Sequence, residues 1–171
     1  VMELFASKGY DTGVLENTLE VADKCNAELK TKSYLLPKYN DRFDSVWYLR
    51  EIAETALFSR TLGEEYKSRL EEELTVIEQT GFADYFLIIW DLVNWARNNN
   101  IGVGPGRGSV GGSLLAFLLD ITKVDPIEHG LLFSRFINPD RNDYPDIDLD
   151  FEDKRRNEVK QYLKDKWGED H

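Results

Sequence analysis

The sequence has a single cysteine, Cys25, so the chain cannot form an internal disulfide bond. Its two histidines, His129 and His171, are too few and too far apart to predict a zinc cluster. No apolar run approaches the roughly 20 residues that cross a membrane, and the first residues carry no secretion signal. These absences predict a cytoplasmic protein without a membrane partner, in which Cys25 is a reduced core thiol.

Positive charge is also scarce. The chain has 21 basic and 32 acidic residues, which gives a net charge of −11. Free-standing nucleic-acid-binding domains are usually basic, so this balance argues against a simple duplex-binding module. It does not exclude a catalytic domain whose DNA contacts lie in another part of the protein. With 171 residues, 42% of them hydrophobic, the chain can bury a core as one domain or as a piece of a larger protein.

The stretch PDIDLDF, residues 145–151, alternates Asp146, Asp148 and Asp150 with apolar residues. Period-two alternation predicts a half-buried strand with its carboxylates on one face, roughly 6.5–7 Å apart. Two such carboxylates repel by about 2–2.5 kcal/mol at an effective dielectric constant of about 20. A cation would offset this repulsion, and oxygen ligands suit Mg²⁺, Mn²⁺ or Ca²⁺. The alternative is a solvated sheet edge. An EF-hand loop is excluded because its glycine and glutamate positions are occupied by other residues.

The stretch GVGPGRGSVGGS, residues 102–113, is rich in glycine and precedes an apolar run, 114–119. Glycines allow a close backbone approach to a ligand, and the start of a helix favours phosphate. Ser109 and Ser113 can cap the helix or bond a phosphate oxygen, and Arg107 adds a fixed positive charge. The alternatives are a plain turn or a dinucleotide-binding fingerprint, but no clear βαβ unit surrounds the glycines.

The two motifs together are more specific than either one alone. A glycine–serine loop that holds a triphosphate, followed by an acidic strand that holds two metal ions, suits nucleotidyl transfer. The protein then contributes mainly positioning and charge compensation. The sequence therefore predicts an enzyme that transfers a nucleotide to a hydroxyl group.

Periodicity predicts the remaining elements. The polar, turn-rich stretch 31–44 is the best candidate for a domain boundary. The run Glu71 to Glu73 is expected to be a solvated helix face. Short strands are expected at 101–103 and 131–137, and helices at 15–29, 45–62, 64–80, 82–99, 114–119 and 153–167.

The motifs GPGRGS, LLFSRFINPDR and PDIDLDF, in this order and spacing, resemble the bacterial (or phage) replicative DNA polymerase III alpha subunits of the C family. The resemblance covers nearly the whole chain. It implies an α+β fold, a DNA polymerase beta-like nucleotidyltransferase palm that is helix-rich with a small mixed sheet and incomplete in this fragment. Residues 1–30 would be the tail of a preceding histidinol-phosphatase-like (PHP) domain, and residues 31–171 the N-terminal part of the palm.

The same resemblance implies roles for individual residues. Asp146 and Asp148 would be the catalytic carboxylates that hold two Mg²⁺ ions, for which Mn²⁺ can substitute. Nucleotide-binding roles fall to Arg107, Gly108, Ser109 and Ser113, and supporting roles to Asp150, Arg155 and Arg156. The two arginines either face DNA or phosphate or pair with nearby acids.

The implied partners are primer–template DNA, a dNTP, and a sliding clamp and other replisome subunits that bind outside this region. The family's third catalytic aspartate would lie beyond residue 171, so the fragment alone is expected to be inactive. The competing function is a non-catalytic domain that binds nucleotide or metal.

Overall fold

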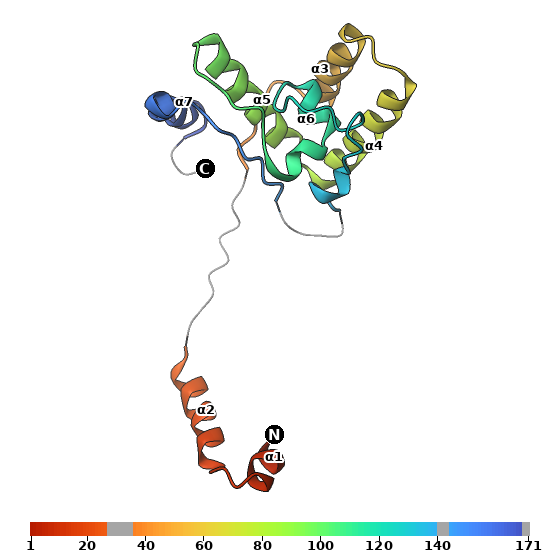
Figure 1. Cartoon of the computed structure of the whole chain (residues 1–171). Helices are drawn as coiled ribbons and strands as arrows, with labels where there is room; N and C mark the ends of the chain where they lie inside the picture. The colour runs from red at the N-terminus through yellow and green to blue at the C-terminus, as the bar shows by residue number, and fades with distance from the viewer. Residues whose placement is uncertain (27–35, 140–143, 169–171) are drawn as a thin grey trace. The chain divides into compact units, whose positions relative to one another are not determined.

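The computed structural model describes residues 1–26, 36–139 and 144–168. The chain divides into two compact units, Val1–Tyr34 and Leu35–His171 (Figure 1). Both expected motifs lie in the second unit. Which domain each unit belongs to stays a prediction.

Four longer helices build the second unit. They are α3 (Ser45–Ser59), α4 (Glu64–Thr80), α5 (Ala83–Asn98) and α7 (Arg156–Trp167). Each lies within two or three residues of its expected bounds. α3 is capped by the carboxylate of Asp44, which accepts from the backbone N–H of Trp47. α4 ends at Gly81 in the left-handed conformation, as expected for a glycine stop.

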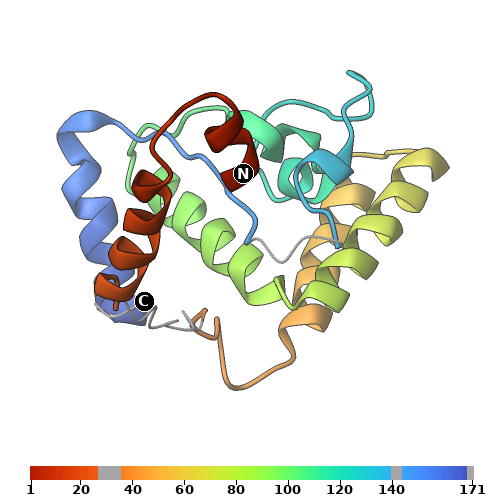
Figure 2. The same cartoon turned by 90° about the horizontal axis from the view of Figure 1, so that it is seen from below.

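The core lies where α3, α4 and α5 surround the short helix α6 (Leu114–Leu118) (Figure 2). Phe86 of α5 and Leu114 and Leu115 of α6 are completely buried in it. A smaller apolar cluster joins α5 to α7 through Leu92 and Val159. The expected helix at 82–99 is therefore confirmed, and it contributes to both apolar clusters.

The expected mixed sheet is wrong: the described residues form helices and contain no strand or sheet. The glycine loop (residues 102–113) and the acidic segment (residues 145–151) are extended, but they pair only at two isolated antiparallel bridges, Val103 with Phe151 and Arg107 with Asp148. Four residue steps separate Val103 from Arg107 but three separate Asp148 from Phe151, so the glycine loop has one residue too many for a continuous register, and its glycines also weaken a strand. A continuous ladder therefore does not form.

The expected strand at 131–137 is also wrong. This segment contains the short 3₁₀ helix η2 (Phe133–Arg135). Phe133 and Phe136, three residues apart, lie on the same side of a 3₁₀ turn, and Phe136 is buried against the core. The apolar residues here follow a period of three rather than two.

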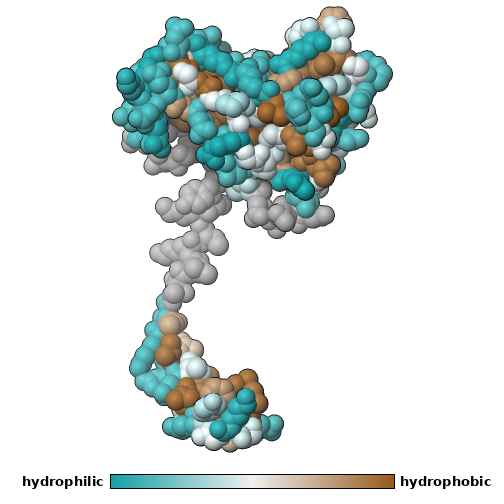
Figure 3. Space-filling view, viewed as in Figure 1, coloured by the Kyte–Doolittle hydropathy of each residue, from teal (hydrophilic) through white to brown (hydrophobic). Residues whose placement is uncertain are grey.

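The first unit contains α1 (Met2–Ser7) and α2 (Gly13–Lys24). No residue of α2 is buried, and apolar surface remains exposed on this unit (Figure 3). Cys25 follows α2 and is exposed, so the expectation of a core thiol is wrong. Among the described residues of both units, no helix is long and apolar enough to cross a membrane.

Candidate functional site

Backbone hydrogen bonds hold the glycine loop against the acidic segment. The N–H of Gly104 donates to the carbonyl of Asp150 at 2.8 Å, and the N–H of Glu152 donates to the carbonyl of Gly102 at 2.9 Å. With the two bridges, these bonds set the register of the pair. The start of η1, the 3₁₀ helix Gly108–Gly112, therefore lies beside the middle of the acidic segment.

At Gly108 the loop comes close to the side chain of Asp148. The φ of Gly108, +78°, is in the left-handed region, and a Cβ atom added there would lie 3.1 Å from Oδ2 of Asp148. Both the conformation and the contact favour glycine over any other residue. The motif glycine and the motif aspartate that the sequence singled out thus touch in the structure.

The acidic segment shows the expected alternation of faces, although it is not a strand. Ile147 is buried, and Leu149 packs against the core. Asp146 and Asp150 are exposed and Asp148 is half-buried. The apolar side chains thus anchor the segment while the carboxylates remain accessible to a ligand.

Arg107 lies between two of these carboxylates. Its Nη1 is 3.0 Å from Oδ2 of Asp148, and its Nε is 3.2 Å from Oδ2 of Asp150. Exposed ion pairs of this kind contribute only about 0–1 kcal/mol each. The segment carries three carboxylates and Arg107 pairs with two of them, so the segment keeps a net negative charge that a cation can offset.

Tyr85 of α5 lies below the acidic segment, where its hydroxyl accepts from the N–H of Ile147 at 3.3 Å. Burial raises the pKa of Tyr85, and the negative charges of Asp146 and Asp148 raise it further, although the hydrogen bond from Ile147 opposes the shift. The raised pKa of Tyr85 thus reflects mainly burial, to which the negative charges of the two expected metal ligands add.

A small cavity of about 180 Å³ connects the two motifs. Ser109 of the glycine loop and Asp146 of the acidic segment both line it, together with residues that include Ser134 and Arg135. A larger cavity of about 910 Å³ lies between α3 and α4, but no expected site residue lines it. The smaller cavity is the one that relates to the expected chemistry.

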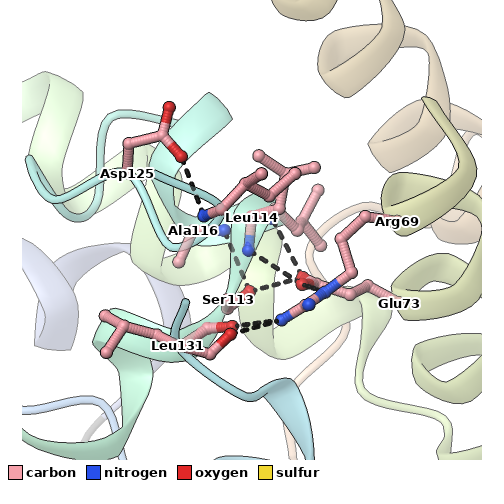
Figure 4. Close-up of polar contacts among 10 residues, drawn as sticks. Arg69, Glu73, Ser113, Leu114, Ala116, Asp125 and Leu131 are labelled. Carbon is pink, nitrogen blue, oxygen red and sulfur yellow. Dashed lines mark hydrogen bonds and ion pairs between the residues drawn. The ribbon is translucent and has the colours of Figure 1, made fainter. Parts of the chain in front are cut away.

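Ser113 has a different surrounding. It has no exposed surface, its hydroxyl donates to Glu73 Oε2 at 2.9 Å, and its Oγ accepts from the N–H of Ala116 (Figure 4). Ser113 therefore caps α6 from inside the core. The expected contact between the start of this helix and a phosphate does not fit the structure, because a carboxylate of the protein already lies there.

Of the two arginines after the acidic segment, Arg155 pairs with an acid. It makes two hydrogen bonds to Glu158, at 2.8 and 2.7 Å, and its Nη1 donates to the carbonyl of Asn99 at 2.8 Å. This position joins the start of α7 to the end of α5. Arg156 is exposed in the first turn of α7.

The carboxylates do not form a complete metal cage. Among the described residues, no group of three or more His, Cys, Asp or Glu side chains is arranged to hold a metal ion. Asp146 and Asp148 supply hard oxygen ligands that fit Mg²⁺ or Mn²⁺, but an ion bound there needs further ligands.

Sequence reasoning missed Glu73, which was expected on a solvated face and is completely buried. A signal was present in the sequence. Glu73 falls at the same helical spacing as Leu70, Leu74 and Ile77, which are the buried residues of α4. It also lies four residues after Arg69, a spacing that allows an ion pair.

Comparison with known proteins places these features in a family. The sequence profile described as the bacterial DNA polymerase III alpha NTPase domain matches residues 45–171. DNA polymerase III subunit alpha of Aquifex aeolicus is 47% identical over 175 residues, which cover 96% of this chain and 15% of that protein. The corresponding subunit of Halalkalibacterium halodurans is 50% identical over 160 residues, covering 90% and 14%.

The same subunit of Staphylococcus aureus strain MRSA252 is 50% identical over 154 residues, covering 88% of this chain and 14% of the relative. The chain thus spans only about a seventh of the length of these curated relatives. The profile match includes the whole glycine loop and the whole acidic segment. On these findings, the chain belongs to the bacterial DNA polymerase III alpha family.

Proposed function

We propose that the polypeptide to which this chain belongs is a DNA-directed DNA polymerase, and that the glycine loop and the acidic segment are part of its active site. The reaction would add a deoxynucleotide to a primer 3′-hydroxyl and release pyrophosphate. Family membership supports the reaction class. The observation that carries the site assignment is the contact between Gly108 and Asp148, with Ser109 and Asp146 lining one cavity.

Asp146 and Asp148 would hold two Mg²⁺ ions, because both carboxylates are accessible and the loop opposite carries no side chain at Gly108. Bound ions would supply charge stabilisation for the entering and leaving oxygens. The described carboxylates are too few for complete coordination. We propose that phosphate oxygens, water and a further carboxylate elsewhere in the polypeptide complete it.

Arg107, Gly108 and Ser109 would hold the triphosphate of the incoming nucleotide. The guanidinium of Arg107 now pairs with Asp148 and Asp150, so it is already beside the metal-binding carboxylates and can exchange these partners for phosphate oxygens. Asp150 would keep Arg107 in place. Ser113 is left out of this set because it is buried.

Residues 31–171 would form the N-terminal part of the catalytic domain, and residues 1–30 the end of a preceding PHP-like domain. The net charge of −11 suggests that most contacts to primer–template DNA come from other regions, as do those to a sliding clamp and other replisome subunits. The reaction would take place in the cytoplasm.

Primer extension by the full-length polymerase tests this function. Asp146→Asn and Asp148→Asn keep the side-chain shape and remove the charge, so each is expected to lower the extension rate at least about 1,000-fold. Asp150→Asn is expected to cost about tenfold, because it loosens Arg107 without removing a metal ligand. Asp165→Asn, an exposed aspartate of α7, is the matched control and should stay within about twofold. Undiminished extension by Asp146→Asn and Asp148→Asn would favour the non-catalytic binding domain.

A further inference from the structure

Glu73 is an ionisable residue in the core that the proposed reaction does not use. It is completely buried and lies on the face of α4 that packs on α6, among side chains such as Leu70, Leu74 and Leu115. A buried carboxylate is costly unless donors surround it, and removing one of its partners leaves an uncompensated charge. The groups that contact the carboxylate of Glu73 therefore show which part of the chain this residue fixes in place.

Four donors surround the two oxygens of Glu73 (Figure 4). Oε1 accepts from the N–H of Leu114 at 2.9 Å and from Nε of Arg69 at 2.8 Å. Oε2 accepts from the N–H of Leu115 at 3.0 Å and from the hydroxyl of Ser113 at 2.9 Å. Burial raises the pKa of Glu73, and these four hydrogen bonds oppose that increase. Every contact is a donor, which is the set that an ionised carboxylate requires.

Arg69 extends this contact to the backbone at the end of the glycine loop. Its Nη2 donates to the carbonyl of Gly112 at 2.9 Å and to the carbonyl of Leu131 at 3.2 Å. A Cβ atom added to Gly112 would lie 2.5 Å from the carbonyl oxygen of Leu132. The chain at 131–132 is thus packed directly on the loop. Glu73 and Arg69 together form what we call the carboxylate clamp.

The clamp is connected to the proposed site through one short element. η1 runs from Gly112, which Arg69 holds, back to Gly108, which touches Asp148. At about 2.0 Å per residue in a 3₁₀ helix, these two glycines are roughly 8 Å apart along its axis. A shift of the clamped end would therefore move Gly108 and Ser109 relative to the acidic segment.

We propose that Glu73 and Arg69 are positioning residues that set the place of the nucleotide-binding part of the glycine loop from inside the core. This role rests on the proposed polymerase function. Neither residue belongs to the proposed metal or nucleotide contacts. They act on the reaction through the backbone of residues 108–113.

Glu73→Gln is the sharpest test, because it keeps the volume and replaces one acceptor by a donor. A Gln nitrogen at either oxygen position would face a backbone N–H of α6, that of Leu114 or that of Leu115. We expect single-nucleotide incorporation by the full-length polymerase to slow about 10- to 100-fold, with the half-saturating dNTP concentration raised several-fold, as for a small misplacement of binding groups. Primer–template affinity should stay within about twofold, since most DNA contacts are expected elsewhere.

The matched control is Ile77→Ala, one turn further along α4 and also buried. It destabilises the same helix without removing a hydrogen bond to the loop. At a comparable loss of thermal stability, its dNTP dependence should remain within about twofold of wild type. Equal kinetic changes in the two variants would reduce the clamp to general stability and overturn the proposal.

Amide hydrogen exchange gives a readout that does not depend on activity. Glu73→Gln should speed exchange about tenfold or more at whichever of Leu114 and Leu115 faces the Gln nitrogen, because that N–H group loses its acceptor. Unchanged exchange at these amides, or faster exchange with unchanged dNTP dependence, would overturn the proposal. If Glu73→Gln does not fold, Arg69→Lys, which keeps the charge and loses the hydrogen bonds to Gly112 and Leu131, is compared with Ile77→Ala by its dNTP dependence, and an unchanged dependence would overturn the proposal.

The two proposals fail in different ways. Full activity of Asp148→Asn would refute the polymerase site while leaving the exchange result of the clamp intact. Loss of activity in Asp148→Asn together with normal nucleotide dependence in a folded Glu73→Gln would refute the clamp alone. Both variants are therefore measured side by side.

Discussion

Replacing Gly108 by alanine separates two costs that the structure assigns to this position. The first cost is conformational: at φ +78° a residue with a Cβ atom is strained by about 1–2 kcal/mol. The second is a contact, because the new methyl group would lie 3.1 Å from Oδ2 of Asp148. That distance is a few tenths of an ångström shorter than an ordinary van der Waals contact, so the carboxylate or the loop must move.

Gly81→Ala provides the matched control. Gly81 ends α4 with φ +73°, and a Cβ atom there would have no neighbour within 4 Å. Both variants should therefore lose about 1–2 kcal/mol of stability through backbone strain, measured by thermal melting of the full-length protein. Only Gly108→Ala displaces a proposed metal ligand; a misplacement of 1 Å costs about 100-fold in rate, so a shift of a few tenths of an ångström should cost several-fold.

The assay is single-nucleotide incorporation at saturating Mg²⁺ and dNTP. The expected result is similar melting temperatures for the two variants, with a several-fold rate loss in Gly108→Ala alone. Wild-type incorporation by Gly108→Ala would refute the claim that the loop and Asp148 are closely fitted. An equal rate loss in Gly81→Ala would show that strain, rather than the contact, is responsible.

Two further substitutions test the charges around the site. Arg107→Ala removes the guanidinium that competes with a cation for Asp148. Mn²⁺, measured by electron paramagnetic resonance, should therefore bind the nucleotide-free polymerase several-fold more tightly, whereas the dNTP should bind more weakly. Weaker Mn²⁺ binding would contradict this competition. Arg155→Ala removes the bonds to Glu158 and to the carbonyl of Asn99, so it should lower the melting temperature slightly without changing DNA affinity in a fluorescence-anisotropy titration. A marked loss of DNA affinity would instead assign Arg155 to DNA.

The helices of the second unit could be predicted because their signals are local. The apolar period of α5 and the glycine that ends α4 are visible in the sequence, and both were placed nearly correctly. The alternating faces of the acidic segment were also predictable, because Ile147 and Leu149 pack inward while the aspartates point outward. The alternation of apolar residues and aspartates therefore predicted which side chains of the acidic segment are exposed, but not what they contact.

The failures share a different cause. The alternation at 145–151 predicts a strand, but whether a strand pairs depends on its neighbour, and the glycine loop has one residue more than the acidic segment between the two bridges. Glu73 was placed in solvent because acidic residues are rarely buried, and its four donors come mostly from residues about 40 positions away. These partners could not be predicted, because the sequence of a helix does not show which residues from distant parts of the chain pack against it.

The pairing of the glycine loop with the acidic segment also bears on the order in which the protein folds. Arg107 and Asp150 are 43 residues apart in sequence, so their contact closes a long loop. The length-dependent entropy of such a closure is about 3 kcal/mol, whereas the turns of α4 and α5 form from near neighbours. The helices should consequently assemble earlier and the two motifs meet late. A substitution that weakens the contact between the glycine loop and the acidic segment would then mainly speed unfolding of the site, and it would leave the rate of helix assembly nearly unchanged.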